Sequence, residues 1–279
     1  MAIRIIADSV SDIPLAYQKQ YQIEILPLMV NFEEQSYKDG VDLNPEEFFL
    51  KLKQSNKLPT TSQVNPGTFI EAFERVINAG DEAVVILMSS EMSGTYNAAL
   101  SAVDYLATDR ISVIDSRAIS FGYGLLVIEA ARMAEKGSSR LEIEKEIKLQ
   151  VPQMVNLFIV DTLEYLQKGG RLSAGEAFIG NLLSIKPIIT IEDGKLKSLD
   201  KVRGRKKATK WILDYLEKEK IDLSDKTVGF FHADDSEHLE GFMKEINLRQ
   251  TPKETLKSTV GTVVGTHSGP GCVAISFRR

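Results

Sequence analysis

The sequence predicts an α/β fold with two domains, an N-terminal parallel-sheet α/β/α domain and a C-terminal α+β domain with a mixed sheet. In the first half, short apolar runs alternate with helical patterns, which is typical of parallel βαβ units. The second half adds a hairpin pattern to such units. The chain has 279 residues, of which 43% are hydrophobic and 26% charged, as in ordinary globular proteins. We place the boundary near residue 155, giving domains 1–155 and 156–279.

Three predicted strands of the first half each end at polar residues. These strands cover residues 3–7, 83–88 and 111–114, and they end at Asp8-Ser9, at the loop 89–95 and at Asp115-Ser116. Helical patterns follow them, at 96–106 after the second strand and at 118–135 after the third. Because open α/β sheets bind ligands beyond the carboxyl ends of their strands, the polar residues mark the expected site.

Residues 31–65 lie between the first two of these strands and contain two recognisable segments. A short amphipathic helix begins at Pro45, which suits the first turn of a helix. Residues 58–63 are rich in hydroxyl groups, and Pro59 favours an extended approach to them. We therefore expect a hydroxyl-rich loop here.

The second half begins with an apolar strand at 157–160. Residues 187–196 form a hairpin pattern whose turn is Asp193-Gly194. A helix is expected at 205–220, and later strands at 227–231 and 273–277. A hairpin together with strand–helix units indicates the mixed sheet of the C-terminal domain.

Charge and composition exclude several classes of protein. With 34 Lys and Arg against 39 Asp and Glu, the net charge is 34 − 39 = −5, which disfavours general nucleic-acid binding. The single cysteine, Cys272, excludes an internal disulfide framework, so we expect a cytoplasmic protein. No apolar run approaches the roughly 20 residues that a membrane-spanning helix needs, so we expect no integral membrane segment.

The common catalytic and nucleotide-binding motifs do not occur. The sequence has no phosphate-binding P-loop, no Gly-x-Gly-x-x-Gly, no His-Glu-x-x-His and no Gly-x-Ser-x-Gly. His232 and His238 flank acidic residues that can ligate metals in other settings. We interpret this segment instead as a strand end that passes into a capped helix start, and we predict no metal site.

Two polar segments are candidates for ligand binding. Ser93, Gly94 and Thr95 are expected at a helix N-terminus, where unpaired backbone N–H groups favour an anion. His267 lies in residues 265–271, which we interpret as a glycine-rich loop able to approach a ligand closely. A simple capping role for Ser93 or Thr95, and a plain turn around His267, remain open as alternatives.

Two further functions can be formulated from single features. Ser93, Asp115 and His267 follow the chain order of the α/β-hydrolase triad, which makes a stand-alone acyl hydrolase the alternative function, although the serine lacks the flanking glycines. The basic residues 201–207 could contact an acidic partner, a phosphate or only solvent. A regulator that binds nucleic acid through them would show salt-sensitive retention on DNA.

Nine motifs in order over nearly the whole chain resemble those of the DegV family. They are Asp8-Ser9, residues 59–63, residues 89–96, Asp115-Ser116, residues 163–173, residues 185–187, Gly194-Lys195, residues 201–208 and residues 265–271. One departure is Val64, where many family members have proline. It follows the hydroxyl groups of the motif and leaves them intact.

The resemblance implies a fatty-acid-binding protein, the lipid-carrying subunit of the bacterial fatty acid kinase system. The acyl chain would lie in an apolar tunnel of the N-terminal domain, with its carboxylate near the junction with the C-terminal domain. A separate ATP-binding kinase subunit would phosphorylate the carboxylate to an acyl phosphate. The chain itself would then be a carrier without catalytic residues, a cofactor or a metal, and its ligand would be a long-chain fatty acid.

The resemblance also implies roles for particular residues. Hydroxyl, N–H and imidazole groups of this kind satisfy a buried carboxylate, which is otherwise costly to desolvate. The carboxylate-binding residues would be Thr61, Ser62, Ser93, Gly94, Thr95, Thr266 and His267. Ser116 and Arg171 would lie near the head group, and Arg203, Arg205, Lys206 and Lys207 would dock the kinase.

Overall fold

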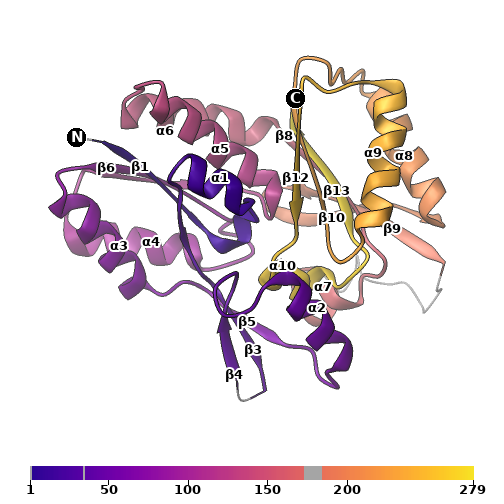
Figure 1. Cartoon of the computed structure of the whole chain (residues 1–279), viewed down its shortest axis with the longest axis horizontal. Helices are drawn as coiled ribbons and strands as arrows, with labels where there is room; N and C mark the ends of the chain where they lie inside the picture. The colour runs from indigo at the N-terminus through magenta and orange to yellow at the C-terminus, as the bar shows by residue number, and fades with distance from the viewer. Residues whose placement is uncertain (1, 34, 173–183) are drawn as a thin grey trace.

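The computed structural model describes residues 2–33, 35–172 and 184–279, so Ser173 of one motif lies outside the described residues. Its N-terminal part is built on a four-stranded parallel sheet with the strand order β2-β1-β6-β7 (Figure 1). The strands are β1 (Ile3–Asp8), β2 (Glu24–Leu26), β6 (Glu82–Leu87) and β7 (Ile111–Asp115). The predicted parallel sheet is thereby confirmed.

Helices cover both faces of this sheet, as an α/β/α arrangement requires (Figure 1). One face carries α3 (Pro66–Asn78) and α4 (Thr95–Leu106), and the other carries α5 (Phe121–Glu135) and α6 (Arg140–Gln150). The short elements η1 (Ser9–Ser11) and α1 (Leu15–Gln20) follow β1, and η2 (Val151–Gln153) follows α6. Helix α5 begins later than predicted because Arg117 and Ser120 have positive φ angles of 53° and 55°.

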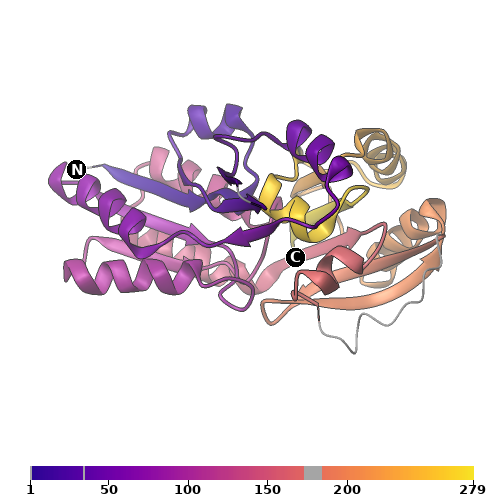
Figure 2. The same cartoon turned by 90° about the horizontal axis from the view of Figure 1, so that it is seen from below.

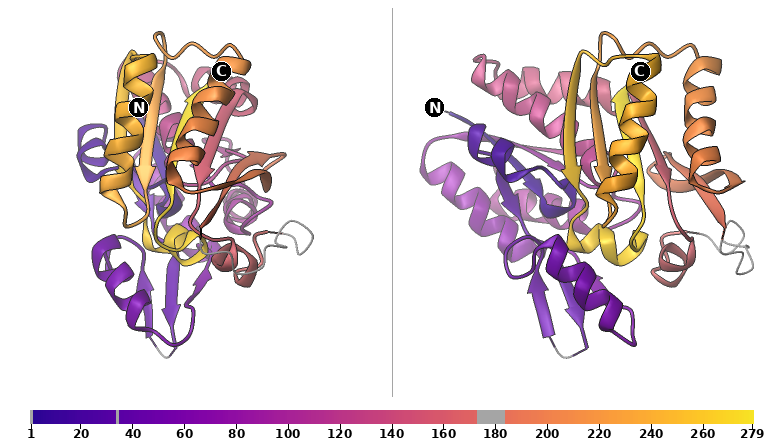
Figure 3. Two further views of the ribbon diagram at one scale, coloured as in Figure 1. Left: turned by 90° about the vertical axis from the view of Figure 1, so that its right-hand side faces the viewer. Right: turned by 45° about the vertical axis from the view of Figure 1, so that its right-hand side comes forward.

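A small antiparallel sheet, with the order β4-β3-β5, projects from this part of the molecule (Figure 3). It consists of β3 (Met29–Phe32), β4 (Gln35–Lys38) and β5 (Thr60–Ser62), with α2 (Pro45–Gln54) between β4 and β5. The expected loop at 58–63 is therefore wrong in part, because Thr61 pairs with Val30 in the sheet. This pairing fixes where the Thr61 side chain lies.

The second half forms a six-stranded mixed sheet with the order β10-β9-β8-β13-β11-β12. Only β11 and β12 pair in parallel, and the predicted turn at Asp193-Gly194 joins β9 to β10. The strands are β8 (Met154–Ile159), β9 (Ile185–Glu192), β10 (Lys195–Arg203), β11 (Thr227–His232), β12 (Glu254–Thr259) and β13 (Val273–Arg278). The predicted mixed sheet is confirmed.

Both faces of the six-stranded sheet are buried, but against different partners. Helices α8 (Arg205–Lys218) and α9 (Ser236–Arg249) cover the outer face, and α5 packs against the inner face (Figure 1). Leu157 and Ile159 accordingly join an outer core, whereas Phe158 and Val160 join the core shared with the first half. Since this core is shared, the division at residue 155 stays a prediction.

Residues 262–268 are helical, which corrects the expected glycine-rich loop at 265–271. Helix α10 (Thr262–Ser268) lies between α2 and the short helix α7 (Glu164–Lys168), as Figure 2 shows from below. Its start is held by the buried side chains of Asp12 and Asp39, which accept the N–H groups of Gly261 at 2.8 Å and Thr262 at 2.9 Å. Carboxylates at this end accept hydrogen bonds from the first backbone N–H groups of the helix, and their negative charge interacts favourably with the helix dipole. None of the helices within the described ranges is long and apolar enough to span a membrane.

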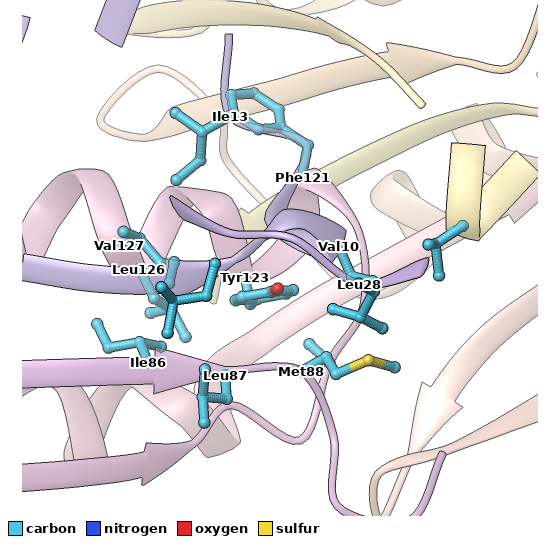
Figure 4. Close-up of a cluster of buried hydrophobic side chains, with 14 of the residues drawn as sticks. Val10, Ile13, Leu28, Ile86, Leu87, Met88, Phe121, Tyr123, Leu126 and Val127 are labelled. Atoms are coloured by element: carbon cyan, nitrogen blue, oxygen red, sulfur yellow. The ribbon is translucent and has the colours of Figure 1, made fainter. Parts of the chain in front are cut away.

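Strand β1 ends at Asp8, whose carboxylate lies in the core between β1, β6 and α5. It accepts hydrogen bonds from the hydroxyl of Tyr123 at 2.6 Å and from the backbone N–H groups of Met88 at 2.8 Å and Val10 at 2.9 Å. Figure 4 shows Tyr123 among the surrounding apolar side chains. Burial raises the pKa of Asp8 to about 6, although these three donors act to lower it.

We expect Tyr123→Phe to destabilise the protein more at pH 8 than at pH 5. The pKa of Asp8 is higher in the folded protein than in the unfolded chain. Its contribution to the free energy of unfolding is therefore present at low pH and is lost as the pH rises through about 6. Above this pH the phenol donates to a charged carboxylate, a bond worth roughly 1.5–3 kcal/mol against about 1 for a neutral one. Urea unfolding at both pH values measures the difference.

The control for this substitution is Tyr105→Phe, because the Tyr105 side chain is 73% exposed. It is expected to change the free energy of unfolding by less than about 0.5 kcal/mol at either pH. Equal losses at pH 5 and pH 8 in Tyr123→Phe would contradict the predicted role of the phenol.

Candidate functional site

An apolar cavity of about 340 Å³ lies between the four-stranded sheet, the six-stranded sheet and α10. Figure 4 shows three of its wall residues, Val10, Leu28 and Met88, beyond the carboxyl end of β6. The remaining apolar wall is formed by Met92, Ile119, Phe158, Val160, Leu166, Ile189, Leu196, Phe231, Val260, Val263, Val264 and Cys272. The site lies beyond strand ends of the parallel sheet, where open α/β sheets bind ligands.

One end of the cavity is polar, and His267 is its central group. Nε2 of His267 lies 2.9 Å from Oγ1 of Thr61, which joins α10 to β5. Burial lowers the pKa of His267 to about 4, and the positive charge of Arg171 contributes to the lowering. Among the described residues Nδ1 has no hydrogen-bond partner, and the ring packs against Gly169, where a Cβ would come within 2.2 Å of Nδ1. The imidazole is therefore neutral at pH 7.

The start of α4 contributes the other polar wall. Ser93 and Gly94 line the cavity, and Gly94 is the N-cap residue of the helix. The hydroxyl of Thr95, which is buried and does not line the cavity, lies 3.0 Å from that of Ser93. A side chain at Gly94 would displace the amide group of Gln63, since a Cβ there would lie 2.1 Å from Oε1 of Gln63. Unpaired N–H groups at such a terminus favour an anionic ligand.

Gln63 lines the cavity but was missed in the sequence analysis. Gln63 ends the hydroxyl-rich segment that also contains Thr61 and Ser62. This position in the sequence therefore already indicates a place beside the predicted carboxylate-binding residues. The proximity of Gln63 to Gly94 depends on the packing of β5 beside the start of α4, which no local sequence pattern reveals.

The structure brings six of the nine predicted carboxylate and head-group residues to the cavity: Thr61, Ser62, Ser93, Gly94, Arg171 and His267. The other three lie elsewhere. Thr95 is fully buried, and Thr266 donates its hydroxyl to the backbone oxygen of Thr262 at 2.9 Å. Ser116 is also fully buried and lines a different pocket beside the turn between β9 and β10, so its predicted position is corrected.

The geometry contradicts the hydrolase triad. Both carboxylate oxygens of Asp115 accept hydrogen bonds from Ser90, at 2.5 Å from its hydroxyl and 3.2 Å from its N–H. Asp115 does not line the cavity, and the His267 ring forms its hydrogen bond with Thr61. Asp115 therefore cannot serve as the aspartate of a catalytic triad with Ser93 and His267, because Ser90 in the loop that follows β6 binds its carboxylate.

The basic segment 201–207, which spans the end of β10 and the first turn of α8, lies outside the cavity. The Arg205 guanidinium forms ion pairs with Asp235 at 2.6 Å and Asp161 at 3.3 Å. Arg203, Lys206 and Lys207 are exposed. Lys201 of the same segment is exposed as well, so the segment offers exposed cations to an acidic partner, while Arg205 forms ion pairs within the protein.

The acidic residues between His232 and His238 cap α9, as predicted. Oδ1 of Asp235 accepts the N–H of His238 at 3.3 Å, and Nδ1 of His232 accepts the N–H of Asp235 at 3.1 Å. The described residues contain no group of three or more His, Cys, Asp or Glu side chains arranged to hold a metal ion.

Comparisons with known proteins agree over the whole length of the chain. A family model described as an uncharacterised protein of the DegV family matches residues 2–279. A DegV domain-containing protein of Caldanaerobacter subterraneus is 42% identical over 99% of both chains. A DegV family structure from Thermus thermophilus, described for its fatty acid binding, has a TM-score of 0.92 and 28% identity and covers 100% of this chain and 99% of its own. The Bacillus subtilis structure of DegV, described as a fatty acid binding protein, has a TM-score of 0.88 and 32% identity, with coverage of 100% and 99%.

Proposed function

Because the chain belongs to the DegV family, we propose that it binds a long-chain fatty acid in the apolar cavity and presents the carboxylate to a separate kinase subunit. The single observation that carries the proposal is an apolar cavity with hydroxyl groups and an imidazole at one end. The fatty acid binding described for the structures from Thermus thermophilus and Bacillus subtilis supports it. The carrier would act in the cytoplasm, where ATP is available to the kinase.

The apolar and polar ends of the cavity contribute differently to binding. Each methylene buried against the apolar wall contributes about 0.8 kcal/mol, so the acyl chain supplies most of the affinity. The carboxylate is oriented by the hydroxyls of Thr61 and Ser93, by N–H groups at the start of α4 and by His267. The lowered pKa of His267 keeps its imidazole neutral, and a carboxylate beside it would raise this pKa and favour a charge-assisted hydrogen bond.

The kinase subunit would transfer the γ-phosphoryl group of ATP to a carboxylate oxygen. A new P–O bond forms to the carboxylate, the bond to the β-phosphate oxygen breaks, and ADP leaves. Such reactions depend mainly on positioning and on charge stabilisation, so the carrier needs no general base of its own. The exposed side chain of Arg171 lines the cavity beside His267 and would face the incoming phosphoryl group.

Native mass spectrometry of the freshly purified protein tests the proposal, followed by solvent extraction of any bound molecule. We expect one long-chain fatty acid per chain. In Ser93→Ala the occupancy should fall several-fold, because one hydroxyl donor to the carboxylate is lost. Protein that is free of lipid and takes up no added fatty acid would refute the proposal.

A second test concerns the exposed cations at the end of β10 and the start of α8. Replacing Arg203 and Lys206 by glutamine should slow phosphorylation by the kinase at least ten-fold, because an attractive patch for an acidic partner is weakened. The loaded fatty acid should remain, since neither residue lines the cavity. Loss of the lipid itself, measured by extraction, would contradict a docking role.

A further inference from the structure

Gln63 lies directly after β5, at an exposed part of the wall of the proposed fatty acid cavity. The residue lines the cavity and is exposed, so its side-chain amide is accessible to a ligand there. Within residues 2–33, 35–172 and 184–279, no hydrogen bond engages this amide. Since a carboxamide can donate two hydrogen bonds, Gln63 brings unused donors to the cavity.

The neighbouring residues show in which direction this segment places its side chains. Thr61 in β5 has its Oγ1 atom 2.9 Å from Nε2 of His267. Ser62 faces differently, because its hydroxyl accepts a hydrogen bond from Nδ2 of Asn31 in β3 at 3.0 Å. Successive side chains alternate between the two sides of a strand, so Gln63 shares the side of Thr61. The second side chain that this segment directs to the head-group end of the cavity is therefore Gln63, rather than the predicted Ser62.

The amide of Gln63 packs against the start of α4. A Cβ at Gly94 would lie 2.1 Å from Oε1, 2.9 Å from Cδ and 3.2 Å from Nε2 of Gln63, so the whole amide group covers this glycine. Gly94 is the N-cap residue of α4 and lines the cavity together with Ser93. Oε1 lies nearest to the helix start, where partial positive charge favours an oxygen atom, and the donors on Nε2 lie farther from it. The amide therefore connects the two polar walls of the cavity, β5 and α4.

We propose that Gln63 donates a hydrogen bond from Nε2 to the carboxylate of the bound fatty acid, and that it makes the cavity select a free acid over an uncharged head group. This inference rests on the proposed function and adds a specificity-determining residue to it. His267 and Thr61 would hold the carboxylate from α10 and β5, while the exposed amide of Gln63 would cover its outer side. A hydrogen bond to a charged acceptor is stronger than one to a neutral acceptor, so the amide favours a carboxylate over a hydroxyl group.

The test is competition of hexadecanoate and hexadecanol for a fluorescent fatty acid bound to the full chain at pH 8. Gln63→Glu keeps the size of the side chain but replaces its donors with a negative charge that repels the carboxylate. We expect it to weaken hexadecanoate binding about ten-fold or more and to change hexadecanol binding less than three-fold. Gln63→Ala removes the donors without adding a charge, and it should weaken hexadecanoate binding several-fold with the same small effect on the alcohol.

The matched control is Gln54→Glu, which makes the same change of charge at the exposed end of α2, outside the cavity. Its affinity for hexadecanoate should stay within two-fold of that of the wild type. Tighter hexadecanoate binding by Gln63→Ala would overturn the inference, because the amide would then compete with the carboxylate for the start of α4. Equal losses for acid and alcohol in Gln63→Glu would also overturn it, since they indicate a general disturbance of the cavity.

The same titrations separate this inference from the proposed function. A wild type that binds neither hexadecanoate nor hexadecanol refutes the proposed function, and the role of Gln63 with it. A wild type that binds hexadecanoate, with unchanged affinity in Gln63→Glu, leaves the proposed function in place and refutes the role of Gln63 alone.

Discussion

Cys272→Trp is expected to leave a folded protein that no longer retains a long-chain fatty acid. Cys272 is 3% exposed and belongs to the cavity wall, so an indole at this position would occupy space that the acyl chain needs. Displacing four methylenes costs about 3 kcal/mol, which corresponds to roughly 100-fold weaker binding. Displacement of a fluorescent fatty acid measures the affinity, and circular dichroism checks the fold.

The matched control is Leu199→Trp, which adds the same indole on β10 at a position outside the cavity. Its side chain is 38% exposed, so it should bind fatty acid as the wild type does. Unchanged affinity in Cys272→Trp would mean that the acyl chain lies elsewhere. The same result would leave the family and the fold untouched, because they rest on other observations.

The features that the sequence predicted correctly depend on neighbours along the chain. The apolar strand 83–88 and the helix after it are each encoded within about twelve residues, and the turn at Asp193-Gly194 has its own local signature. In the structure, Asp193 and Gly194 have φ angles of 51° and 78°, which this residue pair adopts readily. The local sequence pattern also predicted that Ser93 and Gly94 lie at the start of a helix, which is α4 in the structure.

The features that were missed depend on partners far away in the chain. Glycine and serine favour a loop around His267, but α10 forms because Asp12 and Asp39, more than 220 residues earlier, accept its first N–H groups. Thr61 is likewise in a strand because Val30 pairs with it. Tertiary context overrides local propensity at such positions. Six of the nine predicted carboxylate and head-group residues line one cavity, and their role there stays a prediction. Thr61 and His267 lie in a strand and a helix where loops were expected.

His267→Leu is expected to abolish the preference of the cavity for a fatty acid over the corresponding fatty alcohol. Leucine is apolar and similar in bulk, so the acyl chain keeps its contacts while the head group loses the imidazole. It also leaves Thr61 without its ring partner. A hydrogen bond to a charged group contributes about 1.5–3 kcal/mol, so acid-over-alcohol selectivity should fall roughly ten-fold to 100-fold.

Competition between hexadecanoate and hexadecanol for a fluorescent fatty acid measures this selectivity in the wild type and in the variant. The affinity for the alcohol provides the internal control, because it should change less than three-fold if the tail contacts are intact.

The affinity of the wild type for the fatty acid should also depend on pH. The pKa of His267 is about 4 without a neighbouring anion, and a carboxylate ligand raises it. The affinity of the wild type for the acid should therefore increase as the pH falls toward the raised pKa. His267→Leu should show no such increase, and a variant that keeps both the selectivity and this pH dependence would place the carboxylate away from α10.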